Sequence, residues 1–183
     1  GRRAFLKEFL NEKERDVNVK NDRGEPLIFT AVRSKHFDIF KYLIEDRKAD
    51  LKLLNSDKNN ILFAIVDEND LQLMMYVLDD RKVPLDVNWQ NEFGDTLLHK
   101  IAYQHKDIEM LKYLVEEKRA DMNLLNREGR TPLICAASRS AFITSIIISS
   151  TREQTPKSGM KMVTIFGTYH MSVLKRMKQV GLL

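Results

Sequence analysis

The sequence predicts an all-α protein: a solenoid of stacked helix–turn–helix units. Two observations support this prediction. Similar segments begin at intervals of 34, 36 and 35 residues, each at an asparagine: Asn21, Asn55, Asn91 and Asn126. Each segment continues into apolar residues at helical spacing. A period of this length indicates a stacked array, in which short helices bury their apolar faces against neighbouring copies.

The clearest copy covers residues 91–125. Gly94 can adopt the positive φ angle of a tight turn, and Thr96 stands where a side-chain hydroxyl would cap a helix. Two apolar stripes follow at helical spacing, within residues 97–102 and residues 108–115. This copy therefore predicts a turn, a short helix, a second helix and a closing loop.

The other copies share parts of the pattern. The segments Gly-x-Thr-Pro-Leu-x-x-Ala-Ala, ending at Ala137, and Gly-x-Thr-Leu-Leu-His, ending at His99, resemble the ankyrin repeat. The resemblance covers roughly residues 5–150. It implies an L-shaped pair of helices, a projecting hairpin, a concave face and, usually, protein binding. Two departures from the family pattern are Pro26, where threonine is usual, and Lys58, where the turn glycine is usual.

The repeat register divides the chain into seven predicted segments. They are an N-terminal half-repeat cap (1–20), three repeats (21–54, 55–90 and 91–125), a truncated fourth repeat (126–148), a polar loop (149–159) and a degenerate C-terminal repeat or capping helix (160–183). The alternative for the last segment is a helix that packs elsewhere or against another domain.

Composition and charge exclude several classes of function. Residues 151–183 hold six Lys and Arg residues against one acid, a local charge of +5, which leaves −1 for the rest of a chain whose total is +4. A neutral repeat array argues against nucleic-acid binding over the fold. No apolar run reaches the roughly 18 residues of a membrane span. The single cysteine allows no internal disulfide. We expect an intracellular protein, in the cytoplasm or alternatively the nucleus, without membrane insertion.

His99 and Cys135 are the candidates for chemistry. A catalytic pair of the two would lack a group that orients the imidazole, and Cys135 is expected to be buried and inert. The other histidines, His36, His105 and His170, form no i, i+4 pair, so no metal site is predicted. No phosphate loop or nucleophile elbow is present. We therefore expect no enzyme activity and no cofactor. The family resemblance implies that His99 hydrogen-bonds backbone between neighbouring repeats.

Binding chemistry is better supported. By resemblance, the hairpin tips and the exposed ends of the first helices form the concave face. The predicted partner-binding residues are three aromatic anchors (Trp89, Phe93 and Tyr103), three acids (Asp57, Asp67 and Glu68) and three bases (Arg127, Arg130 and Arg139). Interface hot spots are enriched in aromatic residues and arginine. The alternative is that Trp89 packs onto the array and Phe93 covers a neighbouring hairpin.

These features predict a non-enzymatic module that binds another protein through the concave face of the stack, as a monomer rather than a homo-oligomer. Two alternatives stay open. The chain could be the regulatory or targeting segment of a larger enzyme or channel. It could also be a permanent subunit of an assembly, held by its outer helices or its basic C-terminal segment.

Overall fold

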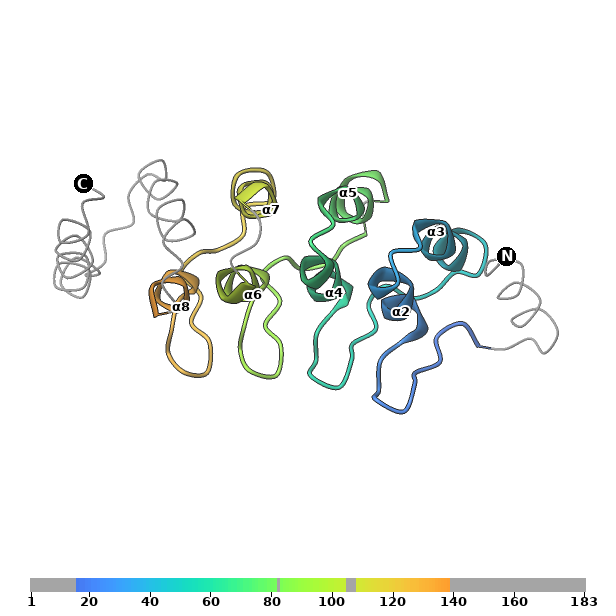
Figure 1. Cartoon of the computed structure of the whole chain (residues 1–183), viewed down its shortest axis with the longest axis horizontal. Helices are drawn as coiled ribbons and strands as arrows, with labels where there is room; N and C mark the ends of the chain where they lie inside the picture. The colour runs from blue at the N-terminus through green and yellow to red at the C-terminus, as the bar shows by residue number, and fades with distance from the viewer. Residues whose placement is uncertain (1–15, 82, 105–107, 139–183) are drawn as a thin grey trace, which may run out of the picture. The chain divides into compact units, whose positions relative to one another are not determined.

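The computed structural model describes residues 16–81, 83–104 and 108–138 of the 183-residue chain. Its helices lie in two rows, with the hairpin loops projecting beyond the inner row (Figure 1). The inner row consists of α2 (Leu27–Arg33), α4 (Ile61–Glu68), α6 (Leu97–Gln104) and α8 (Pro132–Ser138). The outer row consists of α3 (Phe37–Glu45), α5 (Leu71–Met75) continued by the wider π-helical turn η1 (Tyr76–Asp80), and α7 (Ile108–Lys112) continued by η2 (Tyr113–Glu117). Within the described ranges every regular element is a helix, which confirms the predicted all-α class.

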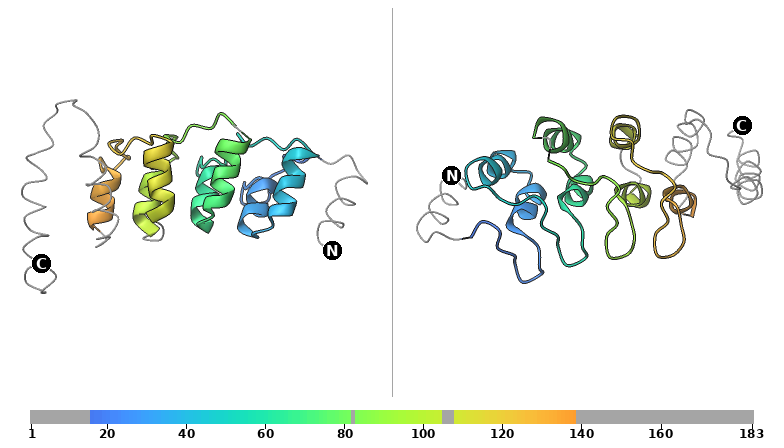
Figure 2. Two further views of the ribbon diagram at one scale, coloured as in Figure 1. Left: turned by 90° about the horizontal axis from the view of Figure 1, so that it is seen from above. Right: turned by 180° about the vertical axis from the view of Figure 1, so that it is seen from behind.

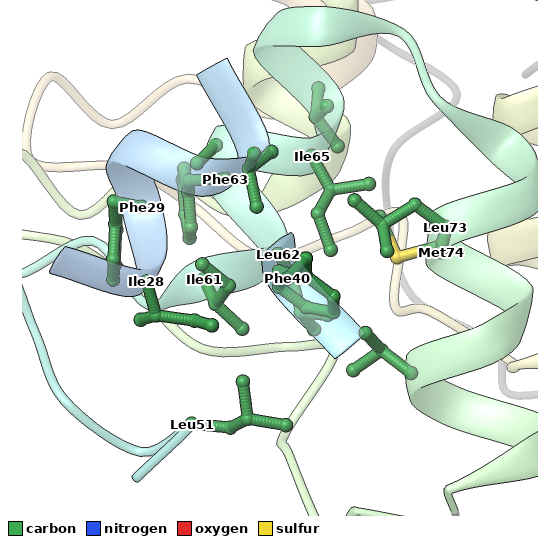
Figure 3. Packing of buried hydrophobic residues seen from close by; sticks show 14 of the residues in the cluster. Ile28, Phe29, Phe40, Leu51, Ile61, Leu62, Phe63, Ile65, Leu73 and Met74 are labelled. Atoms are coloured by element: carbon green, nitrogen blue, oxygen red, sulfur yellow. The ribbon is translucent and has the colours of Figure 1, made fainter. Parts of the chain in front are cut away.

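Neighbouring inner helices pack side by side, α2 on α4, α4 on α6 and α6 on α8 (Figure 2). The core lies between the rows. All six residues of the segment 61–66 in α4 are at most 2% exposed, because α2, α5 and α6 surround this helix. Figure 3 shows side chains from both rows gathered in this layer, among them Phe40 of α3 and Leu62 of α4. Each short helix is therefore stabilised by its neighbours more than by its own sequence.

The leading asparagine folds each described hairpin in the same way. In all four, its side-chain Oδ1 accepts backbone N–H bonds from the residues two and four positions later, at 2.9–3.0 Å. Its backbone N–H donates to the carbonyl of the residue four positions later, and its carbonyl accepts from the N–H three positions later. Asparagine is suited to this position because its short side chain can mimic a backbone turn. The repeated asparagine thus explains the regular shape of the tips.

The fourth residue of each described hairpin has a positive φ angle. Three of these residues are glycine, with φ between 69° and 75°. Lys58 occupies the same position with φ 58°, so the hairpin keeps its geometry without the family glycine. A residue with a Cβ atom in this left-handed region is strained.

Replacing Lys58 with glycine is expected to raise the free energy of unfolding by about 0.5–1 kcal/mol. The gain comes from relief of the left-handed strain, reduced by the greater freedom of glycine in the unfolded chain. Urea unfolding measures the change. Lys58→Ala is the matched control, since it removes the same side chain but keeps Cβ. Equal stabilisation by both substitutions would show that the lysine side chain, not the φ angle, is responsible.

His99 joins the third and fourth repeats. Its Nε2–H donates to the carbonyl of Arg130 at 2.9 Å, which leaves Nδ1 to accept from the backbone N–H of Thr96 at 3.1 Å and from its hydroxyl at 2.9 Å. The ring is fully buried, and burial lowers its pKa below the ordinary value of 6.5. The hydrogen bond between repeats that the family resemblance implied is confirmed.

The first two repeats place phenylalanine where the third has His99. Phe29 and Phe63 are each 1% exposed at this position. The residue at the start of the helix also differs between these repeats. In the first repeat it is Pro26, which has no N–H, and in the second it is Asn60, whose side chain caps α4 by itself.

Candidate partner-binding surface

The hairpin tips form one continuous row, which we name the tip row: residues 22–23, 56–57, 92–93 and 127–128. Successive tips are joined by hydrogen bonds between the second residue of one tip and the first residue of the next. These bonds run from Ser56 Oγ to the Arg23 carbonyl at 2.8 Å, from the Glu92 N–H to the Asp57 carbonyl at 2.8 Å, and from the Arg127 N–H to the Phe93 carbonyl at 3.0 Å. The tips thus present side chains in a fixed order.

Further contacts below the tips hold the hairpins together. The side-chain amide of Asn91 donates to Asn59 Oδ1 at 2.9 Å, and that of Asn126 donates to Asp95 Oδ1 at 2.9 Å. Gly94 lies so close to the next hairpin that a Cβ atom there would be 2.7 Å from the Arg127 backbone nitrogen. The tip row therefore behaves as a preformed surface and not as a set of independent loops.

Phe93 is the aromatic residue that this surface exposes. Its side chain is 56% exposed, although its backbone is held on both sides. Its N–H donates to Asn91 Oδ1 at 2.9 Å, and its carbonyl accepts from the next hairpin. A large apolar side chain on a fixed backbone in water is a common feature of interaction sites.

Trp89 and Tyr103 are less exposed and make contacts within the array. Trp89 is half-buried against the core, and its Nε1–H donates to the carbonyl of Lys58 at 2.7 Å. It packs onto the array, as the alternative interpretation predicted. Tyr103 is half-buried beside Cys135, and its hydroxyl contacts the Cys135 thiol at 3.3 Å and the Asn126 amide at 3.3 Å. Burial raises the pKa of this hydroxyl above its usual value. The three aromatic side chains therefore do not form a single exposed cluster.

The acids of the inner helices are paired within the stack. Asp67 lies 2.9 Å from Lys100 and 3.9 Å from Arg33, and it also accepts a hydrogen bond from Gln104. Glu68 lies 3.6 Å from Lys35. The pairs of Asp67 connect α4 to α2 and α6, and that of Glu68 connects α4 to the turn after α2, so both acids contribute to the cohesion of the stack. A partner would have to compete with these ion pairs.

Most charged residues of the tip row differ from these paired groups. Five of them form no ion pair among the residues that the structure describes: Asp22, Arg23, Asp57, Glu92 and Arg127. By contrast, the guanidinium of Arg130 lies 3.0 Å from Glu128. Arg139 falls outside the described residues. Glu92 is not among the nine predicted partner-binding residues, although by resemblance it lies on the concave face. The tip-to-tip hydrogen bond places it beside Asp57.

The described residues contain no group of three or more His, Cys, Asp and Glu side chains placed to hold a metal ion. Cys135 is 1% exposed, and burial raises the pKa of its thiol. Among the helices of the described ranges, none is both long and apolar enough to cross a membrane.

The fold and the tip row define a helical repeat protein with a preformed surface. Residues 62–156, just over half of the chain, match the family described as ankyrin repeats in three copies. The chain belongs to the ankyrin-repeat family. No curated protein matches it. Ankyrin repeats are in general protein–protein interaction modules, and the family is typically non-enzymatic.

Proposed function

We propose that this protein binds another protein through the tip row and the adjoining face of the inner helices. The main support for the proposal is the exposure of Phe93. Its side chain is 56% exposed, while hydrogen bonds hold both its backbone N–H and its carbonyl. A fixed surface loses little conformational freedom on association, so more of the contact energy appears as affinity. Covering Phe93 would remove apolar surface from water.

The outer row offers an alternative surface, which would suit a permanent subunit of an assembly. Phe37 is 45% exposed and Met75 is 44% exposed. Polar groups here are largely paired, however. The Tyr76 hydroxyl donates to Glu45 at 2.9 Å, and Arg81 lies 3.5 Å from the same carboxylate. The role of a regulatory or targeting segment in a larger protein is compatible with either surface.

Phe93→Ala is expected to weaken partner binding by about 2 kcal/mol, or roughly 30-fold in Kd. Phe37→Ala removes the same side chain from the outer row and is expected to change Kd by less than about twofold. The partner is first captured from lysate with the wild-type chain and identified. Its affinity for all three chains is then measured by calorimetry.

Circular dichroism and urea unfolding check that both variants keep the fold. Because neither phenylalanine belongs to the buried core, both should remain folded. If Phe37→Ala weakens binding and Phe93→Ala does not, the binding site lies on the outer row. That result would contradict the proposal and favour the assembly subunit.

A further inference from the structure

The tip row presents its unpaired groups in a definite order. The hydrogen bond from the Glu92 N–H to the Asp57 carbonyl brings two acids to one junction between tips, which we name the acidic junction. The next bond, from the Arg127 N–H to the Phe93 carbonyl, brings an exposed aromatic ring and a base to one junction, which we name the aromatic junction. The two acids and the basic residue therefore lie at different junctions of the row, and the exposed ring lies with the base.

The acidic junction carries negative charge that no described cation offsets. Asp57 is exposed and Glu92 is half-buried, and neither lies within ion-pair distance of a Lys, Arg or His among the residues described. Like charges on neighbouring backbone segments repel each other. A cationic side chain from a partner would relieve this repulsion and gain two attractions at once.

The aromatic junction requires a different partner group. Phe93 suits an apolar side chain, and the planar guanidinium of Arg127 suits a carboxylate, which it can bind with two parallel hydrogen bonds. Glu128, the next residue, is already within 3.0 Å of Arg130 and so does not neutralise Arg127. A purely basic segment would be repelled here, and a purely acidic one would be repelled at the acidic junction.

The repeat spacing sets the distance between the two junctions. They are one repeat apart, and packed helices lie about 8–10 Å from each other. An extended chain advances about 3.3 Å per residue. A partner segment that crosses the row therefore moves from one junction to the next in about three residues.

We propose that the partner segment is an extended chain that places a basic residue on the acidic junction and, about three residues away, an apolar residue next to an acidic residue on the aromatic junction. This inference rests on the proposed function and specifies the chemistry of its partner. It follows from the order of Asp57, Glu92, Phe93 and Arg127 along the tip row.

A selection of random twelve-residue peptides tests this pattern. Displayed peptides are selected on the immobilised full chain after depletion on the Phe93→Ala variant, and the enriched peptides are synthesised with a fluorescent label. Their Kd values are measured by fluorescence anisotropy. We expect enrichment of peptides that carry a Lys or Arg about three residues from an apolar–acidic pair, in either chain direction.

Charge reversals then assign each peptide charge to its junction. Asp57→Lys combined with Glu92→Lys should weaken binding by at least about tenfold, and changing the basic residue of the peptide to Glu should restore it. Arg127→Glu should likewise be rescued by changing the acidic residue of the peptide to Lys. Lys52→Glu is the matched control, because Lys52 is an exposed base that lies outside the tip row and forms no ion pair among the described residues. It should change Kd less than twofold.

Two results would overturn the inference: enriched peptides without this charge pattern, or peptides whose affinity is unchanged by both reversals. Failure to enrich any peptide would also overturn it. None of these results contradicts the proposed function, which is tested by the loss of partner affinity in Phe93→Ala. Conversely, a partner that binds Phe93→Ala with the same affinity as the wild type contradicts the proposed function itself.

Discussion

Gly94→Ala is expected to lower the free energy of unfolding by about 3 kcal/mol, whereas Gly129→Ala should lower it by about 1 kcal/mol. Both glycines have a positive φ, 75° and 69°, so both variants strain the backbone. They differ in their surroundings. A Cβ on Gly94 would lie 2.7 Å from the backbone nitrogen of Arg127 and 3.1 Å from two carbons of Asn126. A Cβ on Gly129 meets no atom of the described residues within 4 Å.

The difference between the two variants measures the close approach of the hairpins. The atoms near Gly94 belong to the backbone of the next hairpin, so they cannot move aside by a change of rotamer. Urea unfolding of the wild type and of both variants measures the two losses in free energy of unfolding. The slope of that free energy against urea concentration is compared among the three chains. Equal losses would show that the hairpins separate easily, and the tip row would then not be a preformed surface.

His99→Phe is expected to lower the free energy of unfolding by about 2–4 kcal/mol at pH 7.5. Phe29 and Phe63 occupy the same register position in the first two repeats, so the ring is compatible with this site. The loss arises because the Thr96 N–H and the Arg130 carbonyl lose their partner inside the stack. Phe63→Leu, an apolar exchange at the matching position, should cost less, since it leaves no polar group unpaired.

The same variant should remove a pH dependence from stability. Burial lowers the folded-state pKa of His99, and the hydrogen bond to the Arg130 carbonyl and the charge of Asp95 only partly oppose this. Below pH 6.5 the imidazole therefore binds a proton in the unfolded chain but not in the folded chain. The free energy of unfolding falls with decreasing pH until the pKa of His99 in the folded state is reached. The slope is at most about 1.4 kcal/mol per pH unit. Urea unfolding between pH 7.5 and pH 5 should show this fall for wild type and a flatter profile for His99→Phe; parallel profiles would place the titration elsewhere.

Periodic features of the fold could be predicted from the sequence. The spacing of the asparagines located the hairpins, and the stripe within residues 97–102 located α6, which the structure gives as Leu97–Gln104. The ankyrin resemblance located the hydrogen bond of His99 to the next repeat. The asparagines and the apolar stripes recur along the chain, so a single sequence displays them directly. The bond of His99 reaches a residue 31 positions away and was expected only from the family resemblance.

The state of individual surface residues could not be predicted in the same way. The partner of Trp89 is the carbonyl of Lys58, 31 residues away, and Asp67 is paired with Lys100, 33 residues away. Such contacts depend on the rotation of one repeat relative to the next, which the period does not specify. The positive φ of Lys58 follows from the asparagine turn and not from the propensity of lysine.

The most direct test of partner binding through the tip row is site-specific photo-crosslinking. A benzophenone amino acid replaces Phe93 in one chain and Phe37 in another, and each chain is mixed with the identified partner and irradiated. We predict a crosslink from position 93, mapped by mass spectrometry to one segment of the partner, and none from position 37. A crosslink from position 37 alone would place the partner on the outer row and contradict the account.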